Sequence, residues 1–325
     1  MKMAILGAGG IATKMATTIR EMAEVESYAI ASRDLKKAED FAKEYGMQHA
    51  YGSYEEMLAD PKVDLVYIAV PHSHHHEWTL KALEAGKHVL CEKAFAVNEK
   101  QAREMIELAK KKGLLLAEAI WTRYMPSRKI ITEIIENGTI GELKTISANL
   151  GYKIDHVERI MEPSLAGGAL LDLTVYPLNF VSMFWGDDIK KIQGHCVKTK
   201  SGVDGQETVT IEYQDGRVAT MFTTIYSLTD RKGLICGSEG FIEVENINNP
   251  ESIKVYKPEN NGPKLFAEYP IPEQITGFEY QVEACMTAIK EGKTECPQMP
   301  HSQIIEIMRQ MDELRRQFEI VYPFE

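Results

Sequence analysis

Two short segments of the sequence carry residue types that can move a proton. Lys93 follows the apolar run His88–Cys91, and Asp172 and Tyr176 stand four residues apart in a second apolar stretch. A partly desolvated ammonium can bind a substrate hydroxyl or share its proton, because burial lowers a lysine pKa. If the second stretch is helical, its carboxylate and phenol share one face. A solvated lysine and a buried tyrosine with a satisfied hydroxyl are the alternatives.

A glycine-rich turn near the start of the chain is typical of dinucleotide binding. The apolar run Met1–Leu6 meets the spacing G-x-G-x-x-A and passes into a helical pattern. The first glycine permits a tight turn, the second lets the backbone approach a pyrophosphate, and free N–H groups at the helix start supply an anion site. We therefore expect a cofactor-binding turn made of Gly7, Gly9, Gly10, Ile11 and Ala12.

The end of the next expected strand, Val25–Ala31, bears on which dinucleotide is bound. Ser32 and Arg33 follow this strand, and Asp34 comes next. A hydroxyl and a guanidinium suit a 2′-phosphate, whereas an acid would bind the ribose diol. The sequence therefore favours NADP, with NAD as the alternative. A solvated turn capped by Asp34 is the structural interpretation of the same residues.

Four histidines lie within five residues after a later buried strand, beginning at His72. Adjacent histidines in one loop rarely converge on a single ion, so we expect no metal site. We expect instead that Pro71, His72 and His75 line the nicotinamide end of a cofactor. A purely structural role for this loop is the alternative.

Composition and charge exclude several classes of partner. The chain has 325 residues, of which 44% are hydrophobic, and a formal net charge of −11. Such a charge argues against nucleic acid and anionic membranes as partners, and we predict no leader or membrane span. The five scattered cysteines, without a C-x-x-C pair, favour reduced thiols. We therefore expect a cytoplasmic protein that binds a small molecule.

Strand and helix signals alternate up to Trp121, which predicts an α/β, doubly wound parallel sheet of the Rossmann type. Beyond it, β signals dominate, and the clearest is a hairpin in which Asp-Gly joins Thr208–Tyr213 to Val218–Ile225. Two helices close the chain. We expect a dinucleotide-binding domain at 1–121 and, at 122–325, a substrate-binding and oligomerisation α+β domain with an open, mostly antiparallel sheet.

Taken together, these segments resemble the Gfo/Idh/MocA oxidoreductases, in particular the branch of glucose-fructose oxidoreductase and dimeric dihydrodiol dehydrogenase. The resemblance covers essentially the whole chain. Its marks are the glycine turn at 7–12, Pro71 with His75, the segments 82–93 and 118–126, the segment 167–172 with Tyr176, and, more weakly, 321–324.

The resemblance implies a nicotinamide-dependent dehydrogenase or reductase for a sugar, diol or related polyhydroxy or carbonyl compound. Lys93 matches the catalytic lysine of the family, Tyr176 its acid/base position and Asp172 the aspartate that orients the substrate. Arg123 falls in a motif that helps to position the cofactor.

The motif around the lysine departs from the family pattern at one position. The family usually reads Glu-Lys-Pro, and this chain reads Glu92-Lys93-Ala94. The resemblance assigns Glu92 and Lys93 to cofactor binding as well. Because Ala94 replaces a proline, the backbone loses a fixed φ directly after the lysine, which affects its placement.

Oxidation of a carbinol needs a base, and the reverse reduction needs the matching acid. A phenol titrates near pH ~10, and a neighbouring cation lowers that pKa by roughly 1 to 3 units. We therefore expect Tyr176 to exchange the proton, Lys93 to hold the substrate oxygen and tune the phenol, and Asp172 to bind a neighbouring hydroxyl. The reverse assignment of Lys93 and Tyr176 stays open, because coupled groups titrate as a pair.

Two rival functions keep the fold but change the chemistry. One is a regulatory protein that senses the nucleotide without catalysis, and the other is an enzyme that uses bound NAD transiently in redox-assisted glycoside cleavage. The intact set of Lys93, Asp172 and Tyr176 counts against a sensor. The sheet face of the second domain is expected to pair with a copy, giving a homodimer or homotetramer.

Overall fold

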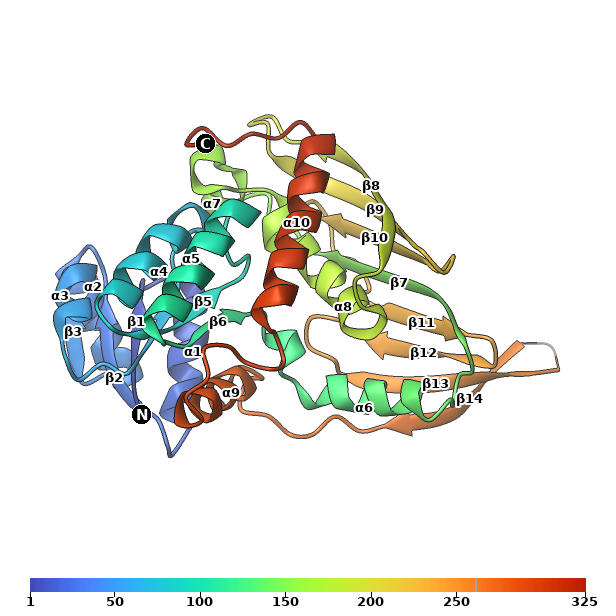
Figure 1. Cartoon of the computed structure of the whole chain (residues 1–325), viewed down its shortest axis with the longest axis horizontal. Helices are drawn as coiled ribbons and strands as arrows, with labels where there is room; N and C mark the ends of the chain where they lie inside the picture. The colour runs from blue at the N-terminus through green and yellow to red at the C-terminus, as the bar shows by residue number, and fades with distance from the viewer. Residues whose placement is uncertain (261) are drawn as a thin grey trace. The chain divides into compact units, whose positions relative to one another are not determined.

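The computed structural model describes residues 1–260 and 262–325, which form two compact units (Figure 1). The first unit comprises Met1–Tyr124 and Gln274–Met308. The second comprises Met125–Glu273 and Arg309–Glu325. The predicted division at 121/122 therefore differs from the observed units, because one C-terminal segment belongs with the first unit.

Contacts within the first unit explain this return of the chain. The ring of Phe278 meets the ring of Trp121 edge to face, with their centroids 4.9 Å apart. The amide of Leu116 donates to the carbonyl of Thr294 at 3.0 Å, and the ring of His301 lies 2.9 Å from the Leu116 carbonyl oxygen. An apolar helix stripe shows that a helix is buried but not which sheet it covers, so the sequence pattern missed this assignment.

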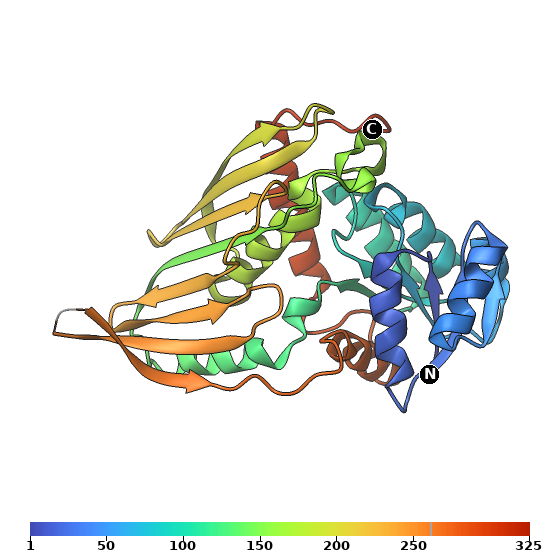
Figure 2. The same ribbon diagram turned by 180° about the vertical axis from the view of Figure 1, so that it is seen from behind.

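The first unit contains the predicted parallel sheet, whose six strands have the order β3-β2-β1-β4-β5-β6. Helices α4 and α5 cover one face and α1 the other, as Figures 1 and 2 show from opposite sides. The strands are β1 (Lys2–Leu6), β2 (Glu26–Ala31), β3 (His49–Tyr51), β4 (Leu65–Ile68), β5 (His88–Glu92) and β6 (Leu116–Ala119). The α-helices are α1 (Gly10–Arg20), α2 (Leu35–Tyr45), α3 (Tyr54–Ala59), α4 (His75–Glu84), α5 (Glu99–Lys112), α9 (Glu279–Lys290) and the first part of α10 (His301–Gln317).

Local sequence signals explain where several of these helices begin. The Asn98 side chain accepts from the Gln101 amide at 2.9 Å and caps α5, as an asparagine followed three residues later by a glutamine predicts. Asp34 caps α2 by accepting from the Lys37 amide at 3.3 Å. Each cap satisfies an N–H group that the first helical turn leaves without an intrahelical partner.

The second unit contains an eight-stranded sheet in the order β14-β13-β12-β11-β7-β10-β9-β8. Within the described residues of this sheet, only β7 and β10 pair in parallel, so the prediction of a mostly antiparallel sheet is confirmed. The strands are β7 (Leu143–Gly151), β8 (Ile189–Lys198), β9 (Asp204–Tyr213), β10 (Val218–Thr224), β11 (Gly233–Gly237), β12 (Gly240–Glu245), β13 (Ser252–Glu259) and β14 (Gly262–Tyr269). The α-helices are α6 (Pro126–Glu136), α7 (Glu158–Met161), α8 (Val175–Trp185) and the last part of α10.

Helices α8 and α10 pack on one face of this sheet (Figures 1 and 2). A Cβ atom added at Gly233 of β11 would lie 2.5 Å from the ring of Phe180, and one at Gly194 of β8 would lie 2.6 Å from Leu314. These glycines therefore permit close approach of helix and sheet. The hairpin predicted from Asp-Gly joins β9 to β10 in antiparallel register.

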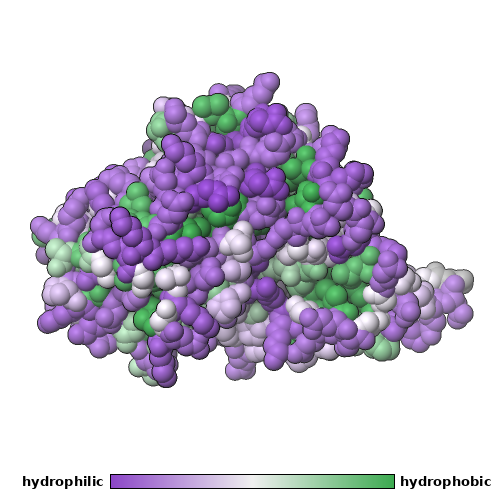
Figure 3. Space-filling model, in the orientation of Figure 1, coloured by the Kyte–Doolittle hydropathy of each residue, from purple (hydrophilic) through white to green (hydrophobic). Residues whose placement is uncertain are grey.

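The segment Pro163–Trp185 is long and apolar enough to cross a membrane by composition, but 89% of its most apolar window is buried within the protein. It is the core segment against which the second sheet packs, as an all-round apolar helix must be. The face in Figure 3 is mostly hydrophilic, with separate hydrophobic patches.

Candidate functional site

The glycine turn after β1 has the geometry that a dinucleotide requires. Gly7 has a φ of +106°, and a Cβ there would lie 2.5 Å from the Ala69 carbonyl oxygen, so only glycine fits. A Cβ at Gly9 or Gly10 would meet nothing within 4 Å. Gly9 caps α1 without a side-chain hydrogen bond to the first turn. The open cradle and the free N–H groups of this helix start fit a diphosphate.

The residues after β2 bear on the choice between NADP and NAD, which the sequence left open. Ser32 is buried and its hydroxyl accepts from the Asp34 amide at 3.3 Å, whereas Arg33 is exposed. The Asp34 carboxylate is engaged as the cap of α2. The Asp34 carboxylate is therefore hydrogen-bonded to the start of α2, whereas the Arg33 side chain is exposed to solvent.

The predicted amine stands at the carboxyl end of β5, in a segment that we call the Lys93 turn (Cys91–Phe95). Lys93 is half-buried and its amide donates to Oε2 of Glu92 at 3.1 Å. Oε1 of Glu92 accepts from the hydroxyl of Tyr67 on β4. The peptide bond between Lys93 and Ala94 is cis. Because Glu92 is buried and hydrogen-bonded inside the protein, it holds the turn.

His75 holds the same turn from α4. Its Nδ1 lies 2.8 Å from the Ala94 carbonyl oxygen, and its Nε2 lies 2.9 Å from that of Val70. Burial lowers the pKa of His75 to about 4, so the ring is neutral at pH 7. Both ring nitrogens face backbone carbonyls, and the neighbouring His72 ring packs edge-on at 5.6 Å. The structure thus gives His75 a structural contact with the Lys93 turn.

Glu118, at the end of β6, is a residue whose role the sequence did not reveal. Its Oε1 accepts from the Phe95 amide at 3.2 Å, so it holds the far side of the Lys93 turn. Burial raises the pKa of Glu118 to about 7, although the nearby Arg123 charge opposes that shift. Arg123 is itself buried, and its Nη2 donates to Gln303 at 3.3 Å. Arg123 therefore lies close enough to Glu118 for its charge to act on that carboxyl, and its role in positioning a cofactor stays a prediction.

Lys14 on α1 is a second residue that the sequence did not single out. Its Nζ lies 3.8 Å from the ring centroid of Trp121 and 4.3 Å from that of Phe278. Burial lowers the pKa of Lys14 to about 8, while the charges of Glu92 and Glu279 oppose this. A helical lysine carries no sequence signal for such a contact, because the two rings come from distant segments.

In the second unit, Asp172 and Tyr176 lie in helical structure, which is the condition under which they would share one face. Asp172 belongs to the π-helix η4 (Leu170–Thr174), which continues directly into α8, where Tyr176 is the second residue. Asp172 is 5% exposed and Tyr176 is 9% exposed. Single π turns occur often at functional sites, because they redirect the side chains that follow.

Asp172 has a cationic partner that the sequence did not predict. Nη1 of Arg159, on α7, lies 2.9 Å from Oδ1 of Asp172. The arginine side chain is 49% exposed and that of the aspartate only 7%. The half-exposed guanidinium forms a charge-assisted hydrogen bond with the buried carboxyl group and keeps further N–H donors at the surface.

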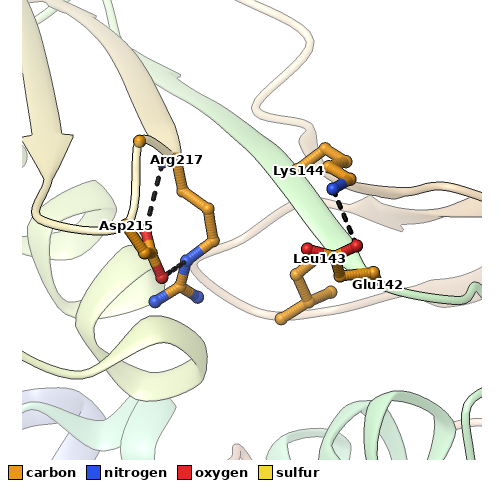
Figure 4. A pocket seen from close by; sticks show the side chains of 6 residues that line it. Glu142, Leu143, Lys144, Asp215 and Arg217 are labelled. Atoms are coloured by element: carbon orange, nitrogen blue, oxygen red, sulfur yellow. Dashed lines mark hydrogen bonds and ion pairs between the residues drawn. The ribbon is translucent and has the colours of Figure 1, made fainter.

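The pocket in Figure 4 lies apart from these residues in the chain, at the β9–β10 turn and the start of β7. Its charges pair with each other: Arg217 with Asp215 at 2.7 Å, and Lys144 with Glu142 at 2.8 Å. We assign no chemistry to it. Among the described residues, no three His, Cys, Asp or Glu side chains come together as metal ligands.

Comparisons with known proteins agree with this architecture. The model described as an oxidoreductase family with an NAD-binding Rossmann fold matches residues 1–119, and that of the GFO/IDH/MocA C-terminal domain matches residues 129–243. Proteins named trans-1,2-dihydrobenzene-1,2-diol dehydrogenase are 33% identical in Danio rerio and 31% identical in Mus musculus, each over 99% of this chain and 98% of the relative.

Two solved structures share the fold. KijD10, a 3-ketoreductase from Actinomadura kijaniata, superposes with a TM-score of 0.89 at 23% identity, covering 98% of this chain and 97% of the other. Levoglucosan dehydrogenase superposes with a TM-score of 0.86 at 18% identity and the same coverage.

Proposed function

Because this chain belongs to the Gfo/Idh/MocA family of NAD(P)-binding oxidoreductases, we propose that it interconverts a CH–OH group and a carbonyl on a sugar, diol or related polyhydroxy compound. The relatives named as diol dehydrogenases support a diol or a sugar as the substrate class. When bound, the nicotinamide cofactor supplies the hydride or accepts it.

The observation that carries this proposal is the gathering of polar groups at one edge of the first sheet. Strands β1, β4, β5 and β6 are parallel neighbours, so their carboxyl ends share an edge. The glycine turn, the Pro71 loop, the Lys93 turn and Glu118 all follow or end these strands. Ligands of open parallel sheets bind at this edge.

We assign the residue roles as follows. Tyr176 exchanges the hydroxyl proton, Lys93 binds the substrate oxygen and lowers the phenol pKa, and Asp172 binds a neighbouring hydroxyl. The reverse assignment of the amine and the phenol remains the second possibility, since coupled groups titrate together.

We propose that NADP is the preferred cofactor, held by the glycine turn, Ser32 and Arg33. Asp34 is engaged at the start of α2, which leaves the Arg33 guanidinium to meet a 2′-phosphate. Gly9 and Gly10 leave room for the diphosphate. A fluorescence titration is expected to give a lower Kd for NADPH than for NADH, and equal values would contradict this preference.

Turnover of two variants tests the catalytic assignment. Tyr176→Phe and Lys93→Met are each expected to lower kcat about 100-fold or more on a sugar or diol panel, because each removes a proton-transfer or oxygen-binding group. The midpoint of urea unfolding serves as the control for folding, because Lys93 is also assigned to cofactor binding. Near-wild-type rates in both variants would place the chemistry elsewhere.

The same assay separates the rival functions. A dehydrogenase or reductase consumes added cofactor in stoichiometric amounts. A nucleotide sensor consumes none, and an enzyme with transient redox chemistry regenerates what it uses. Absence of net NADPH consumption with every carbonyl substrate would favour one of these rivals.

We also propose that the enzyme is a cytoplasmic homodimer or homotetramer. All five cysteines are free thiols, as a reducing compartment allows. Large apolar side chains are exposed on edge strands of the second sheet, at Val197 of β8 and at Leu265 and Phe266 of β14. Such surfaces favour pairing with a copy. Sedimentation as a monomer at micromolar concentration would contradict the oligomer.

A further inference from the structure

Two carboxyl groups lie on the buried side of β9, where the strand pattern calls for apolar residues. Asp204 is fully buried and Glu207 is 1% exposed. Residues three apart on a regular strand point to opposite faces. Here the register with β8 shifts between Val197, which pairs with Gln206, and Lys198, which pairs with Asp204. This irregularity lets both acids point inward. We call them the acid pair.

The acid pair holds both ends of the π-helix that carries Asp172. Oδ2 of Asp204 accepts from the amide of Leu170, the first residue of that helix. Oε2 of Glu207 accepts from the hydroxyl of Thr174, the last residue, at 2.6 Å. The Thr174 oxygen also lies 2.6 Å from the hydroxyl of Thr223 on β10. Since Thr174 donates to Glu207, Thr223 is the donor in this second bond.

One of the two buried carboxyls must hold a proton. Oδ1 of Asp204 and Oε1 of Glu207 receive no donor group within the described part of the chain. Two buried carboxylates that interact this closely repel each other, so the pair retains one proton. Burial, together with the Asp204 charge, raises the pKa of Glu207 well above its usual value, which favours Glu207 as the protonated member.

The surroundings of the acid pair offer it little positive charge. Arg315 on α10 is engaged by Glu325 at 2.6 Å. The Tyr322 phenol is buried nearby, and burial together with the Asp204 charge raises its pKa well above the usual value. Cys196 on β8 faces the pair as well, and burial raises the pKa of its thiol to about 11. None of these three groups neutralises the acids. The shared proton therefore limits the charge repulsion between them.

We propose that Asp204 and Glu207 act as one positioning pair that shares a single proton and thereby fixes the directions of Asp172 and Tyr176. This inference rests on the proposed function for the meaning of those directions. With Glu207 protonated, Thr223 donates to Thr174, Thr174 donates to Glu207, and Glu207 donates to Asp204. Asp204 also accepts from the backbone amide of Leu170. Loss of the proton would place two negative charges side by side and loosen the helix at both ends.

Three variants of the acid pair and its threonine test this. In Glu207→Gln, the amide oxygen accepts from Thr174 and the amide nitrogen donates to Asp204, so kcat/KM is expected to stay within about 3-fold of wild type. Glu207→Ala removes both bonds and is expected to lower kcat/KM about 100-fold, as misplacement of reacting groups does. Thr174→Val removes the hydroxyl that bonds to Glu207 and Thr223 but leaves both acids in place, so its kcat/KM is expected to lie between those of the two Glu207 variants. Glu212→Gln, on the same strand and paired outside with Lys190, is the matched control.

Two readouts separate positioning from general stability. Hydrogen exchange of peptide 167–178 is expected to speed up in Glu207→Ala and Thr174→Val but not in Glu207→Gln or Glu212→Gln. In the pH profile of kcat/KM, the alkaline fall that reflects loss of the shared proton is expected to move or vanish in Glu207→Gln alone.

Several outcomes would overturn the proposal. Wild-type exchange in both Glu207→Ala and Thr174→Val would do so, and so would a failure of Glu207→Gln to rescue what alanine loses. If the wild-type enzyme turned over no sugar or diol, the proposed function would fail while the exchange data still decided the positioning role. If Glu207→Ala did not fold, Thr174→Val and Glu207→Gln would carry the test alone.

Discussion

The Lys93 turn of the first unit and the π-helix of the second are each held by buried acids, but the acids are neutralised in different ways. Glu118 lies beside the buried Arg123 and accepts from the Phe95 amide. Glu207 has a second acid as its neighbour and limits the repulsion with a proton. A cation therefore supports the turn, whereas a proton supports the helix.

This difference has consequences for how each segment responds to change. The charge of Arg123 counteracts the burial of Glu118, so the pKa of Glu118 rises only to about 7. The acid pair has no such compensation, and burial together with the Asp204 charge raises the pKa of Glu207 well above its usual value. The Lys93 turn is thus the segment whose support changes charge near neutral pH.

The largest expected effect comes from removing the acid of the turn. Glu118→Ala leaves the Phe95 amide without its acceptor and removes a buried acid that interacts with the charge of the buried Arg123. Removing one member of such a buried interaction costs about 3–5 kcal/mol of unfolding free energy. Urea unfolding measures the loss, and Glu107→Ala, an exposed acid on α5, is the control. A loss as small as that of the control would show that the turn does not depend on Glu118.

A smaller effect is expected in the pH dependence of stability. The folded pKa of Glu118 is about 7, above its ordinary 4.5, so the folded state binds the proton more tightly. Its stabilising contribution is therefore complete below about pH 4.5 and is lost as pH rises to about 7, by at most about 3 kcal/mol. His75, with its lowered pKa, contributes the opposite slope, and so the comparison is made against Glu118→Gln.

Urea unfolding of the wild type and Glu118→Gln between pH 5 and 8 makes this measurement. The unfolding free energy of the variant is expected to gain on that of the wild type as the pH rises, because glutamine has no proton to lose. If the unfolding free energies of the two proteins changed in parallel with pH, Glu118 would not titrate near neutral pH. The proposed difference in pH response between the Lys93 turn and the π-helix would then be wrong.

The smallest expected effect concerns the exposed partner of Asp172. Arg159→Met removes a half-exposed guanidinium, whose ion pair is weakened by solvent, so KM is expected to rise about 5-fold, or about 1 kcal/mol. Lys153→Met is the control, because that cation pairs with Asp155 instead. Equal KM values for the two variants would mean that Arg159 does not serve the substrate site.

The strands, the hairpin and the capped helices were predictable because their signals are local. Asn98 caps α5 where the spacing to Gln101 placed the cap, and the Asp-Gly pair joins β9 to β10. Strand β14 carried no such signal, since its side chains are mostly exposed and it begins beside Pro263. An edge strand with solvent on both faces has no alternation of polarity to reveal it.

The candidate site was predictable only in part, for a related reason. Lys93, Asp172 and Tyr176 stand in recognisable motifs, and their joint action remains a prediction. The acid pair was missed because the expected strand began at Thr208, while β9 begins at Asp204. Lys14 and Glu118 were missed because their partners, Phe278 and Phe95, are set by tertiary packing that spacing does not encode.

The chain leaves the first unit after Tyr124 and returns to it only at Gln274. The returning segment supplies Phe278 to Trp121 and Gln303 to Arg123. During synthesis on the ribosome, the first unit therefore cannot complete its packing until almost the entire polypeptide has emerged. Premature termination anywhere before Gln274 would yield a fragment that contains the glycine motif but lacks the segment that packs against Trp121 and Arg123.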